Sequence, residues 1–453
     1  MNSSLPNDFI NQMKALLGDQ VKAFVESLDG NSLSSIRMNP YKALSEPVFE
    51  DLVPVKWHDS AFYLKERPIF TLDPNFHTGS YYVQEASSMF ILKAIQTVID
   101  MDHKALRILD LCAAPGGKTT LLSELGPQHL IVTNEVIKSR YQILNENLTR
   151  WGIKNLISIS YDVDRLTELD NMFDIVLVDA PCSGEGLFRK DKEARNHWSL
   201  NSVNHCSARQ KRILEAALSK VKEDGILIYS TCTYNSQENI EQVKWILESS
   251  DFESVQIPIA QNFQIEELLS GDAFGYQFYP HKLRGEGFFM SILKKTAHTG
   301  APQSISKKIK SSLSRKELAL LSELVEIEQE RIYFHHNDTV CVIDQEFEGD
   351  LQLFMKSFRG QFGVGICQMK KQLLIPEHSL SQNPFIKHKL PSLELNKEQA
   401  LRFLKKEQFD YQFTEKGWLQ LNHNKIGLGW GKNLGKRMNN YLPKNLRIRM
   451  QIE

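Results

Sequence analysis

The chain has 453 residues, of which 42% are hydrophobic and 24% charged, and its net charge is −1. This length predicts two or three domains, and this composition is typical of a soluble globular protein. The six cysteines include no C-x-x-C pair, and no H-E-x-x-H segment occurs, so we expect neither a disulfide framework nor a metal site. No apolar run of about eighteen residues and no signal-peptide pattern is present, which predicts a cytoplasmic protein without a membrane partner.

The charge is distributed unevenly along the chain. Residues 296–453 carry a net charge of +7, and residues 1–295 carry −8. The last 29 residues contain one acidic side chain, Glu453, and seven basic ones: Lys425, Lys432, Lys436, Arg437, Lys444, Arg447 and Arg449. A basic end on a nearly neutral protein indicates a polyanionic partner, although a solvated tail would have the same composition.

The first 296 residues follow an order of helices and strands that points to one fold class. Apolar residues from Phe9 to Leu28 recur at helical spacing, and a second helix is expected over 86–101, at the end of a mixed N-terminal lobe. Strands are then predicted at 107–111, 130–135, 156–161, 173–179, 225–230 and 288–295, and helices at 118–125, 137–152, 208–222 and 236–248. This alternation is typical of a doubly wound, mostly parallel α/β sheet.

The remaining third of the chain is built differently. Ser, Lys, Gly and Pro residues predict a linker over 297–315, and a helix is expected at 317–328. Short strands follow, such as 339–343, and a second break lies near 382–392. The sequence therefore predicts two small units after the main sheet.

The turn after the first strand of the sheet, LDLCAAPGGKTT, indicates a nucleotide-like ligand. Its glycine pair lets a ligand approach the backbone. A phosphate-binding P-loop would need glycine where Cys112 stands, and a dinucleotide site would need G-x-G-x-x-G, so both motifs fail. S-adenosylmethionine is the third possibility, because it has no phosphate to bind and its ribose asks for an acid at the end of the second strand.

Three acids stand at successive strand ends: Glu135, Asp162 and Asp179. A single acid in such a place is more often a helix cap or a turn residue than a ligand. Three of them, at the edge of the sheet where α/β proteins bind ligands, indicate a binding site.

Two cysteines follow strands of the same sheet. Cys182 comes directly after the strand that ends in Asp179, and Cys232 comes after the strand at 225–230. A cysteine in such a place can be a small buried hydrophobic residue. Two thiols and a carboxylate on neighbouring strand-end loops instead predict nucleophilic chemistry on a bound substrate.

Several segments together resemble one known family, the Sun-type RNA cytosine-C5 methyltransferases. The resemblance covers residues 1–295 and rests on RMNPYK, YYVQEASSMF, LDLCAAPGGKTT, NEVIKSRYQILNENLTRWGIKN, DAPCSGEGLFRKD, STCTYNSQEN and FYPHKLRGEGFFMSILKK. The segment GLGWGKNLGKRMNNYLPKNLR is similar to the RNA-binding end of the bacterial RsmF-type members, which methylate small-subunit ribosomal RNA. The resemblance implies a Rossmann-like class I methyltransferase fold with an N-terminal α+β lobe and a C-terminal PUA-like RNA-binding domain.

The resemblance also implies a cofactor, S-adenosyl-L-methionine, and a division of roles. Glu135 would hold the ribose, Asp162 the adenine, and Asp179 would lie between cofactor and target base. The cofactor-binding residues are expected to be Cys112, Ala113, Ala114, Pro115, Gly116, Gly117, Lys118, Glu135, Arg140, Asp162 and Asp179. Cys232 would be the nucleophile, and Cys182 would help to resolve the covalent intermediate.

The chemistry of cytosine C5 methylation asks for these residue types. C5 is too electron-poor to attack a methyl sulfonium until a thiolate has added to C6. An acid at N3 assists that addition, and Asp179 is the candidate. Methylation of an amino group would need no nucleophile, so a cysteine pair argues against it.

RNA is expected as the partner, most simply small-subunit ribosomal RNA or the 30S subunit, because a base must leave its stack to be methylated. Candidate RNA contacts are Gln84, Lys190, Lys436, Arg437 and Lys444, with Trp430 and Tyr441 as stacking residues and Arg37, Asn39 and His281 as motif residues without an assigned role. The alternatives are a transfer RNA cytosine-C5 methyltransferase and a catalytically silent RNA-binding or ribosome assembly protein.

These expectations divide the chain into five parts. Residues 1–100 would form an N-terminal RNA-binding lobe, 101–296 the methyltransferase domain and 297–315 a linker. Residues 316–385 would form an intermediate α+β domain, and 386–453 a basic PUA-like RNA-binding domain.

Overall fold

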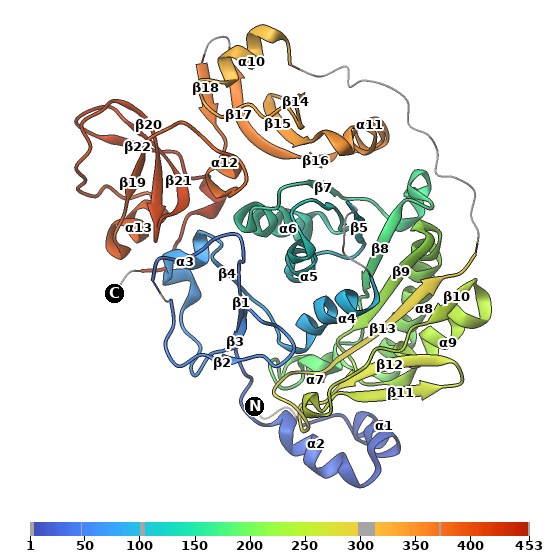
Figure 1. Cartoon of the computed structure of the whole chain (residues 1–453). Helices are drawn as coiled ribbons and strands as arrows, with labels where there is room; N and C mark the ends of the chain where they lie inside the picture. The colour runs from blue at the N-terminus through green and yellow to red at the C-terminus, as the bar shows by residue number, and fades with distance from the viewer. Residues whose placement is uncertain (1–3, 47, 100–104, 298–312, 371–372, 452–453) are drawn as a thin grey trace.

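A computed structural model describes residues 4–46, 48–99, 105–297, 313–370 and 373–451 (Figure 1). Most of the expected linker, residues 298–312, lies outside the described residues. None of the helices in the described ranges is long and apolar enough to cross a membrane.

The N-terminal helix prediction is wrong in one respect, because the chain forms two helices, α1 (Asn7–Leu17) and α2 (Val21–Leu28). Gly18, with φ +53° and ψ −123°, ends α1, and a positive φ of this kind suits glycine because it has no Cβ. The pair packs against the part of the chain that forms the main sheet, where the ring centroids of Phe9 and Phe188 lie 4.9 Å apart. The helices therefore buttress the loop that follows Cys182 (Figure 1).

A small sheet follows, with strand order β2-β3-β1-β4. Its strands are β1 (Ser35–Met38), β2 (Val53–Pro54), β3 (Ala61–Tyr63) and β4 (Tyr81–Val83). The short helix α3 (Pro74–His77) precedes β4, and α4 (Phe90–Val98) leads from the lobe into the main sheet.

The main sheet confirms the doubly wound, mostly parallel prediction, with order β11-β12-β13-β9-β8-β5-β6-β7-β16 (Figure 1). Its parallel strands are β5 (Arg107–Asp110), β6 (Leu130–Asn134), β7 (Leu156–Ile159), β8 (Phe173–Asp179) and β9 (Val221–Thr231). The strands β10 (Phe252–Ser254), β11 (Glu266–Ser270), β12 (Ala273–Phe278) and β13 (Phe288–Lys295) pair antiparallel. The helices are α5 (Gly117–Leu122), α6 (Lys138–Trp151), α7 (Ala194–His197), α8 (Leu200–Lys220) and α9 (Ile240–Ser249).

The central strands are buried on both faces, which explains their continuous apolar runs. Successive residues alternate between two cores: Leu109 and Val132 belong to one, and Ile108 and Ile131 belong to the other. The carboxyl ends of β5, β6, β8 and β9 consequently meet at one edge, where the candidate residues follow.

The intermediate part forms its own sheet of β14 (Arg331–His336), β15 (Thr339–Asp344), β17 (Val364–Lys370) and β18 (Leu373–Pro376). It also contains α10 (Arg315–Leu321) and α11 (Glu348–Ser357). The predicted helix at 317–328 is thus too long, because the chain turns after Leu321 and buries Leu324 and Val325. Strand β16 (Gly360–Phe362) of the intermediate part pairs antiparallel with β7 and extends the main sheet.

The C-terminal sheet contains β19 (Ser392–Glu394), β20 (Gly417–His423), β21 (Ile426–Asn433) and β22 (Met438–Asn440), with α12 (His378–Gln382) before it and α13 (Lys397–Leu404) beside it. This unit touches the N-terminal lobe, where Asn424 Nδ2 donates to Asn75 Oδ1 at 2.8 Å. It also touches α6, where Asn445 Nδ2 donates to Glu146 Oε1 at 2.7 Å.

Candidate active site

Cys182 and Cys232 come together at the carboxyl edge of the main sheet. They follow β8 and β9, which are adjacent and parallel, and their Sγ atoms lie 3.2 Å apart. Both side chains are partly exposed, and both are free thiols. The hydrogen bond to Cys232, together with burial, raises the pKa of the Cys182 thiol. Cys182 is therefore held protonated as a hydrogen-bond partner of Cys232.

Two buried carboxylates lock the cysteine loops together. Glu185, in the Cys182 loop, accepts hydrogen bonds from the backbone N–H of Tyr234 and of Asn235 at 2.8 and 3.0 Å. Glu238, on the Cys232 side, accepts one from the N–H of Ser183 at 2.9 Å. Each loop thus supplies the acceptor for the other, which fixes the two thiols relative to each other.

Gly186 adds a backbone contact to the same junction. Its N–H donates to the carbonyl of Cys232 at 2.8 Å. A Cβ at Gly186 would lie 2.5 Å from Gly287 O and 2.9 Å from Cys232 O, so the two loops pack too closely for any side chain there.

Asp179 lies at the end of β8 and pairs with Lys118 from the turn after β5, residues 112–118, which is called here the cofactor turn. Lys118 Nζ is 2.8 Å from Asp179 Oδ2, and the hydroxyl of Ser230 donates to Asp179 Oδ1 at 3.0 Å. Burial is the largest single influence and lowers the pKa of Lys118, but the attraction and hydrogen bond of Asp179, together with Cys232 and Asp110, outweigh it, so that the pKa is raised. A carboxylate and an ammonium therefore stand beside the two thiols.

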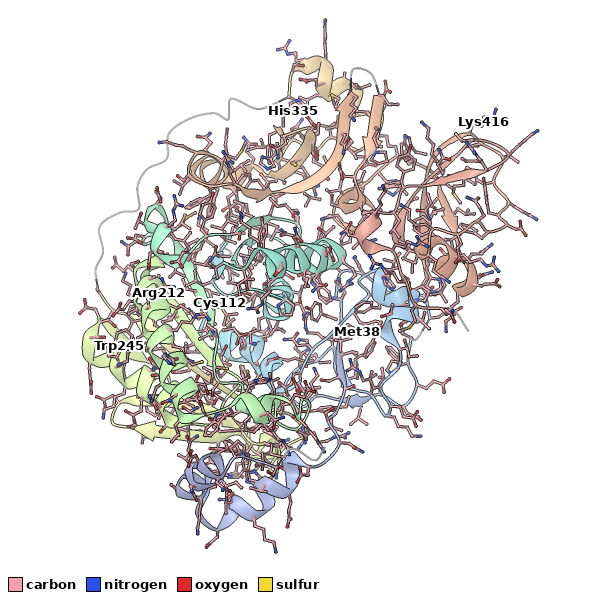
Figure 2. The ribbon with its side chains drawn as sticks, turned by 180° about the vertical axis from the view of Figure 1, so that it is seen from behind. Met38, Cys112, Arg212, Trp245, His335 and Lys416 are labelled. Carbon is pink, nitrogen blue, oxygen red and sulfur yellow. The ribbon has the colours of Figure 1, made fainter. Side chains whose placement is uncertain are left out.

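The turn after β5 is shaped for a ligand at its backbone. Gly116 has φ +107°, and a Cβ on it would lie 3.2 Å from Leu144. The turn is held from behind by α6, since Arg140 Nη2 donates to Ala114 O at 2.6 Å and Asn147 Nδ2 donates to Pro115 O at 2.7 Å. Figure 2 labels Cys112, which is partly buried at the start of this turn, near the middle of the view.

Asp110, which sequence reasoning missed, supports the presence of a cationic ligand at this turn. Thr119 Oγ1 donates to its Oδ2 at 2.6 Å, whereas its Oδ1 is buried without a hydrogen-bond partner among the described residues. Burial is the main reason that the pKa of Asp110 is raised to about 7. The ammonium group of S-adenosylmethionine is positively charged and can donate hydrogen bonds, so it fits beside the unpaired Oδ1 of this buried carboxyl group. The sequence could have identified Asp110 as a candidate site residue, because it ends β5 within the segment LDLCAAP.

The other two predicted cofactor acids differ in environment. Glu135 is 3% exposed, accepts a hydrogen bond from the N–H of Ile137 at 2.9 Å, and lies 3.6 Å from Arg140 Nη1. The Asp162 side chain is 40% exposed, pairs with Arg212, and accepts from the N–H of Asp164 at 3.2 Å. Asp162 thus also serves as the N-cap of the short 3-10 helix Val163–Arg165. Its partner Arg212 is labelled in Figure 2.

The motif residues Arg37 and Gln84 are buried behind the cofactor turn. Arg37 donates to Gln84 Oε1 at 3.0 Å and to Thr120 Oγ1 at 2.6 Å, and it pairs with Glu124. Gln84 Nε2 donates to Ser88 Oγ at 3.1 Å, so the polar atoms of Gln84 bind protein groups. These motif residues therefore support helix α5 from the N-terminal lobe.

The predicted RNA contacts in the basic regions are mostly at the surface. Lys190, Lys436, Arg437 and Lys444 are exposed. The stacking role for Trp430 is wrong, because its side chain is 1% exposed and its Nε1 donates to Glu377 O at 2.8 Å. Tyr441 is 39% exposed and packs edge-on against Trp418. No group of three or more potential metal ligands occurs among the described residues.

Comparisons with known proteins match three parts of the chain. Residues 97–294 match the family model of 16S rRNA methyltransferase RsmB/F, residues 5–86 the N-terminal domain of 16S rRNA methyltransferase RsmF, and residues 390–448 the methyltransferase RsmF PUA domain.

Individual relatives agree with these family models. Ribosomal RNA small subunit methyltransferase F of Erwinia tasmaniensis is 34% identical over 64% of each chain. The protein of the same name from Vibrio cholerae is 29% identical over 98% of each chain. The crystal structure of PH0851 superposes with a TM-score of 0.57 at 30% identity, covering 64% of this chain and 66% of that one.

Proposed function

The chain belongs to the family of 16S rRNA methyltransferases RsmB/F, and we propose that it transfers a methyl group from S-adenosyl-L-methionine to C5 of a cytosine in small-subunit ribosomal RNA. The observation that carries the reaction type is the pair of thiols 3.2 Å apart beside the Lys118–Asp179 ion pair. Transfer to an oxygen or an amino nitrogen would need no thiol nucleophile, whereas transfer to C5 of a pyrimidine does.

The cofactor would bind at the carboxyl edge of the main sheet, and it would supply a methyl group on a sulfonium. The backbone of the turn from Cys112 to Lys118 would hold its methionine part, with Asp110 opposite its ammonium. Glu135 would accept hydrogen bonds from the ribose, and Asp162 would lie at the adenine end. Arg140 would keep the turn in place through its bond to Ala114 O.

Cys232 would begin the reaction by adding its thiolate to C6 of the flipped cytosine. The new S–C6 bond displaces the electrons of the C5–C6 double bond toward N3, where the ammonium of Lys118, positioned by its ion pair with Asp179, stabilises the negative charge that develops. C5 then carries the electron density needed to accept the methyl group. Lys118 and Asp179 therefore act on the base while the thiol activates it.

Cys182 would act in the second half of the reaction. After methyl transfer, C5 holds both a methyl group and a hydrogen, and a base must remove that proton. The electrons of the C5–H bond re-form the C5–C6 double bond and expel the thiolate of Cys232. A water molecule would take the C5 proton, while the protonated thiol of Cys182, whose Sγ lies 3.2 Å from that of Cys232, would donate a hydrogen bond to the departing thiolate.

Bisulfite sequencing of total RNA from cells with and without the gene tests the proposal. A cytosine of 16S rRNA should be protected in the parent cells and lose its protection in the deletion. If methylation is lost only in transfer RNA, the substrate is transfer RNA instead of ribosomal RNA. No lost methylation anywhere would leave only an RNA-binding or ribosome assembly role.

A further inference from the structure

A groove of about 640 Å³ runs across the N-terminal lobe to the cofactor turn. Its lining includes Arg67 and Ile69 of the N-terminal lobe, Arg150 of α6, and Tyr82, whose hydroxyl donates to the carbonyl of the lining residue Pro115 at 3.3 Å. We propose that this groove, called here the lobe groove, seats an unpaired nucleotide of the substrate RNA next to the methylated base. The proposal rests on the proposed function and assigns a path for its substrate.

Two cations of the lobe groove lack carboxylate partners. The Arg67 guanidinium lies 5.2 Å from the ring of Phe70, and its hydrogen-bond partner is Ser34 Oγ at 3.4 Å. The Arg150 guanidinium lies 4.1 Å from the ring of Phe76 and donates to Asn147 Oδ1 at 2.6 Å. Among the described residues, neither cation forms an ion pair, so both can accept a phosphate as their counter-ion.

Burial makes the charge of Arg150 costly in the free protein. Its pKa is lowered, chiefly because the guanidinium is removed from water. Lys42 lies on the same side of the lobe, where its buried Nζ donates to Arg150 O at 2.6 Å and to Thr78 O at 2.7 Å. An anion in the lobe groove would offset the cost of holding these positive charges together.

The floor of the lobe groove is apolar and suits a base. Ile69 is 59% exposed, which is unusual for an isoleucine, and it stands beside the partly exposed Phe76 and Val83. Apolar and aromatic side chains flanked by arginines bind unpaired nucleotides by covering the base face while the arginines bind phosphate. A base within a duplex cannot offer its face, so the groove fits an unpaired nucleotide.

Residues next to the lobe groove contact the basic C-terminal unit. Asn445 binds Glu146, which lies in α6 between Asn145 and the groove residue Asn147. Leu72, which follows the groove residue Thr71, packs against the hydrophobic core of the C-terminal unit. The exposed Lys444 and Arg447 are next in sequence to Asn445 and Leu446, so the C-terminal unit adds basic side chains at its contact with α6.

The chain offers a matched pair of variants for the test. Arg67→Glu reverses a charge in the lobe groove, and Lys65→Glu makes the same reversal two residues away, at a side chain that is 74% exposed and outside the groove. Binding of a fluorescein-labelled single-stranded RNA of about twelve nucleotides is measured by anisotropy over a salt titration. Arg67→Glu should weaken binding by about tenfold or more and lower the salt slope by about 0.7 or more, while Lys65→Glu should change affinity less than about twofold.

Ile69→Ala distinguishes the contact with the base from the contact with the phosphate. Because Ile69 carries no charge, its loss should weaken RNA binding without changing the salt slope. Equal RNA affinities of Arg67→Glu and Lys65→Glu would overturn the proposal. So would an Arg67→Glu defect that is confined to intact 30S subunits, which would make the partner of the groove a ribosomal protein. If the wild-type protein binds the RNA through Arg67 but methylates no ribosomal RNA, the proposed function is wrong, whereas the assignment of the lobe groove as an RNA-binding site is supported.

Discussion

The Sγ atoms of Cys182 and Cys232 lie 3.2 Å apart, although 50 residues separate them in the chain. Adjacent parallel strands bring the two loops together, and Glu185 and Glu238 then fix the loops by accepting backbone N–H groups across the junction. Precise placement of two thiols thus depends on two buried acids that touch neither thiol through their carboxylates.

Glu185→Gln tests this positioning role. The amide keeps the size of the side chain but replaces one acceptor oxygen by a donor that would face the N–H groups of Tyr234 and Asn235. We expect the free energy of unfolding to fall by about 1–3 kcal/mol. Because the Cys232 loop shifts, kcat should fall by up to about 10²-fold at saturating RNA.

Glu193→Gln is the control for that variant, since Glu193 is exposed in the same connection between β8 and α8. It should leave urea unfolding and kcat unchanged. Equal kcat values for Glu185→Gln and the wild type would show that the carboxylate does not position Cys232.

Asp110 gives a pH dependence of stability. Its pKa is about 7 in the folded chain and near 3.8 when unfolded, so between these values the folded state binds more protons. Stability of the cofactor-free protein should therefore fall as the pH rises from about 4 to about 7, with the penalty fully present above about 7. Asp110→Asn should remove this penalty and stabilise the protein increasingly toward neutral pH.

Urea unfolding of both proteins at about pH 5 and about pH 8 measures the effect. The stability difference between Asp110→Asn and the wild type should be larger at the higher pH. The variant should also bind S-adenosylmethionine more weakly, because the carboxylate opposite the ammonium is gone. A pH-independent difference would contradict a raised pKa at Asp110.

Arg107 joins the main sheet to the intermediate unit. Its guanidinium binds Asp350 through two hydrogen bonds of 2.6 and 2.8 Å, and this pairing is the main reason that its pKa is raised. Asp350→Ala should lower the free energy of unfolding by about 1–3 kcal/mol, because the partly buried Arg107 loses its partner. Glu346→Ala, at an exposed acid nearby, should change it by less than about 0.5 kcal/mol in the same denaturation experiment.

The strands of the main sheet could be predicted because buried parallel strands appear as uninterrupted apolar runs bounded by turns. The candidate site followed from the same pattern, since Asp179 ends β8, Cys182 lies in the loop after β8, and Cys232 directly follows β9. β16 could not be predicted, because three residues carry no periodicity and their partner β7 lies about two hundred residues earlier. The burial of Trp430 was missed for a related reason, since its cover comes from the preceding unit.

The basic C-terminal unit yields a prediction about affinity. Changing the exposed Lys436, Arg437 and Lys444 together to Ala should weaken RNA binding and reduce the salt slope by about two, at about 0.7 per phosphate contact. Affinity for S-adenosylmethionine should not change. Figure 2 shows Lys416, which touches Gly435 beside this basic group, on the opposite side of the molecule from Trp245 in α9.

Lys211→Ala with Lys244→Ala is the control for the basic group, because both lysines are exposed on α8 and α9. That double variant should bind RNA like the wild type. Identical salt slopes for the triple variant and the wild type would remove this surface from the RNA interface.

The most direct test of the central claim separates the two thiols. Each cysteine is changed to Ala, the protein is incubated with substrate RNA and S-adenosylmethionine, and covalent protein–RNA adducts are measured on a denaturing gel. Cys182→Ala should accumulate an adduct, because Cys232 still adds to C6 but release is blocked, and Cys232→Ala should form none. An adduct that persists in Cys232→Ala and disappears in Cys182→Ala would contradict the assignment of Cys232 as the nucleophile.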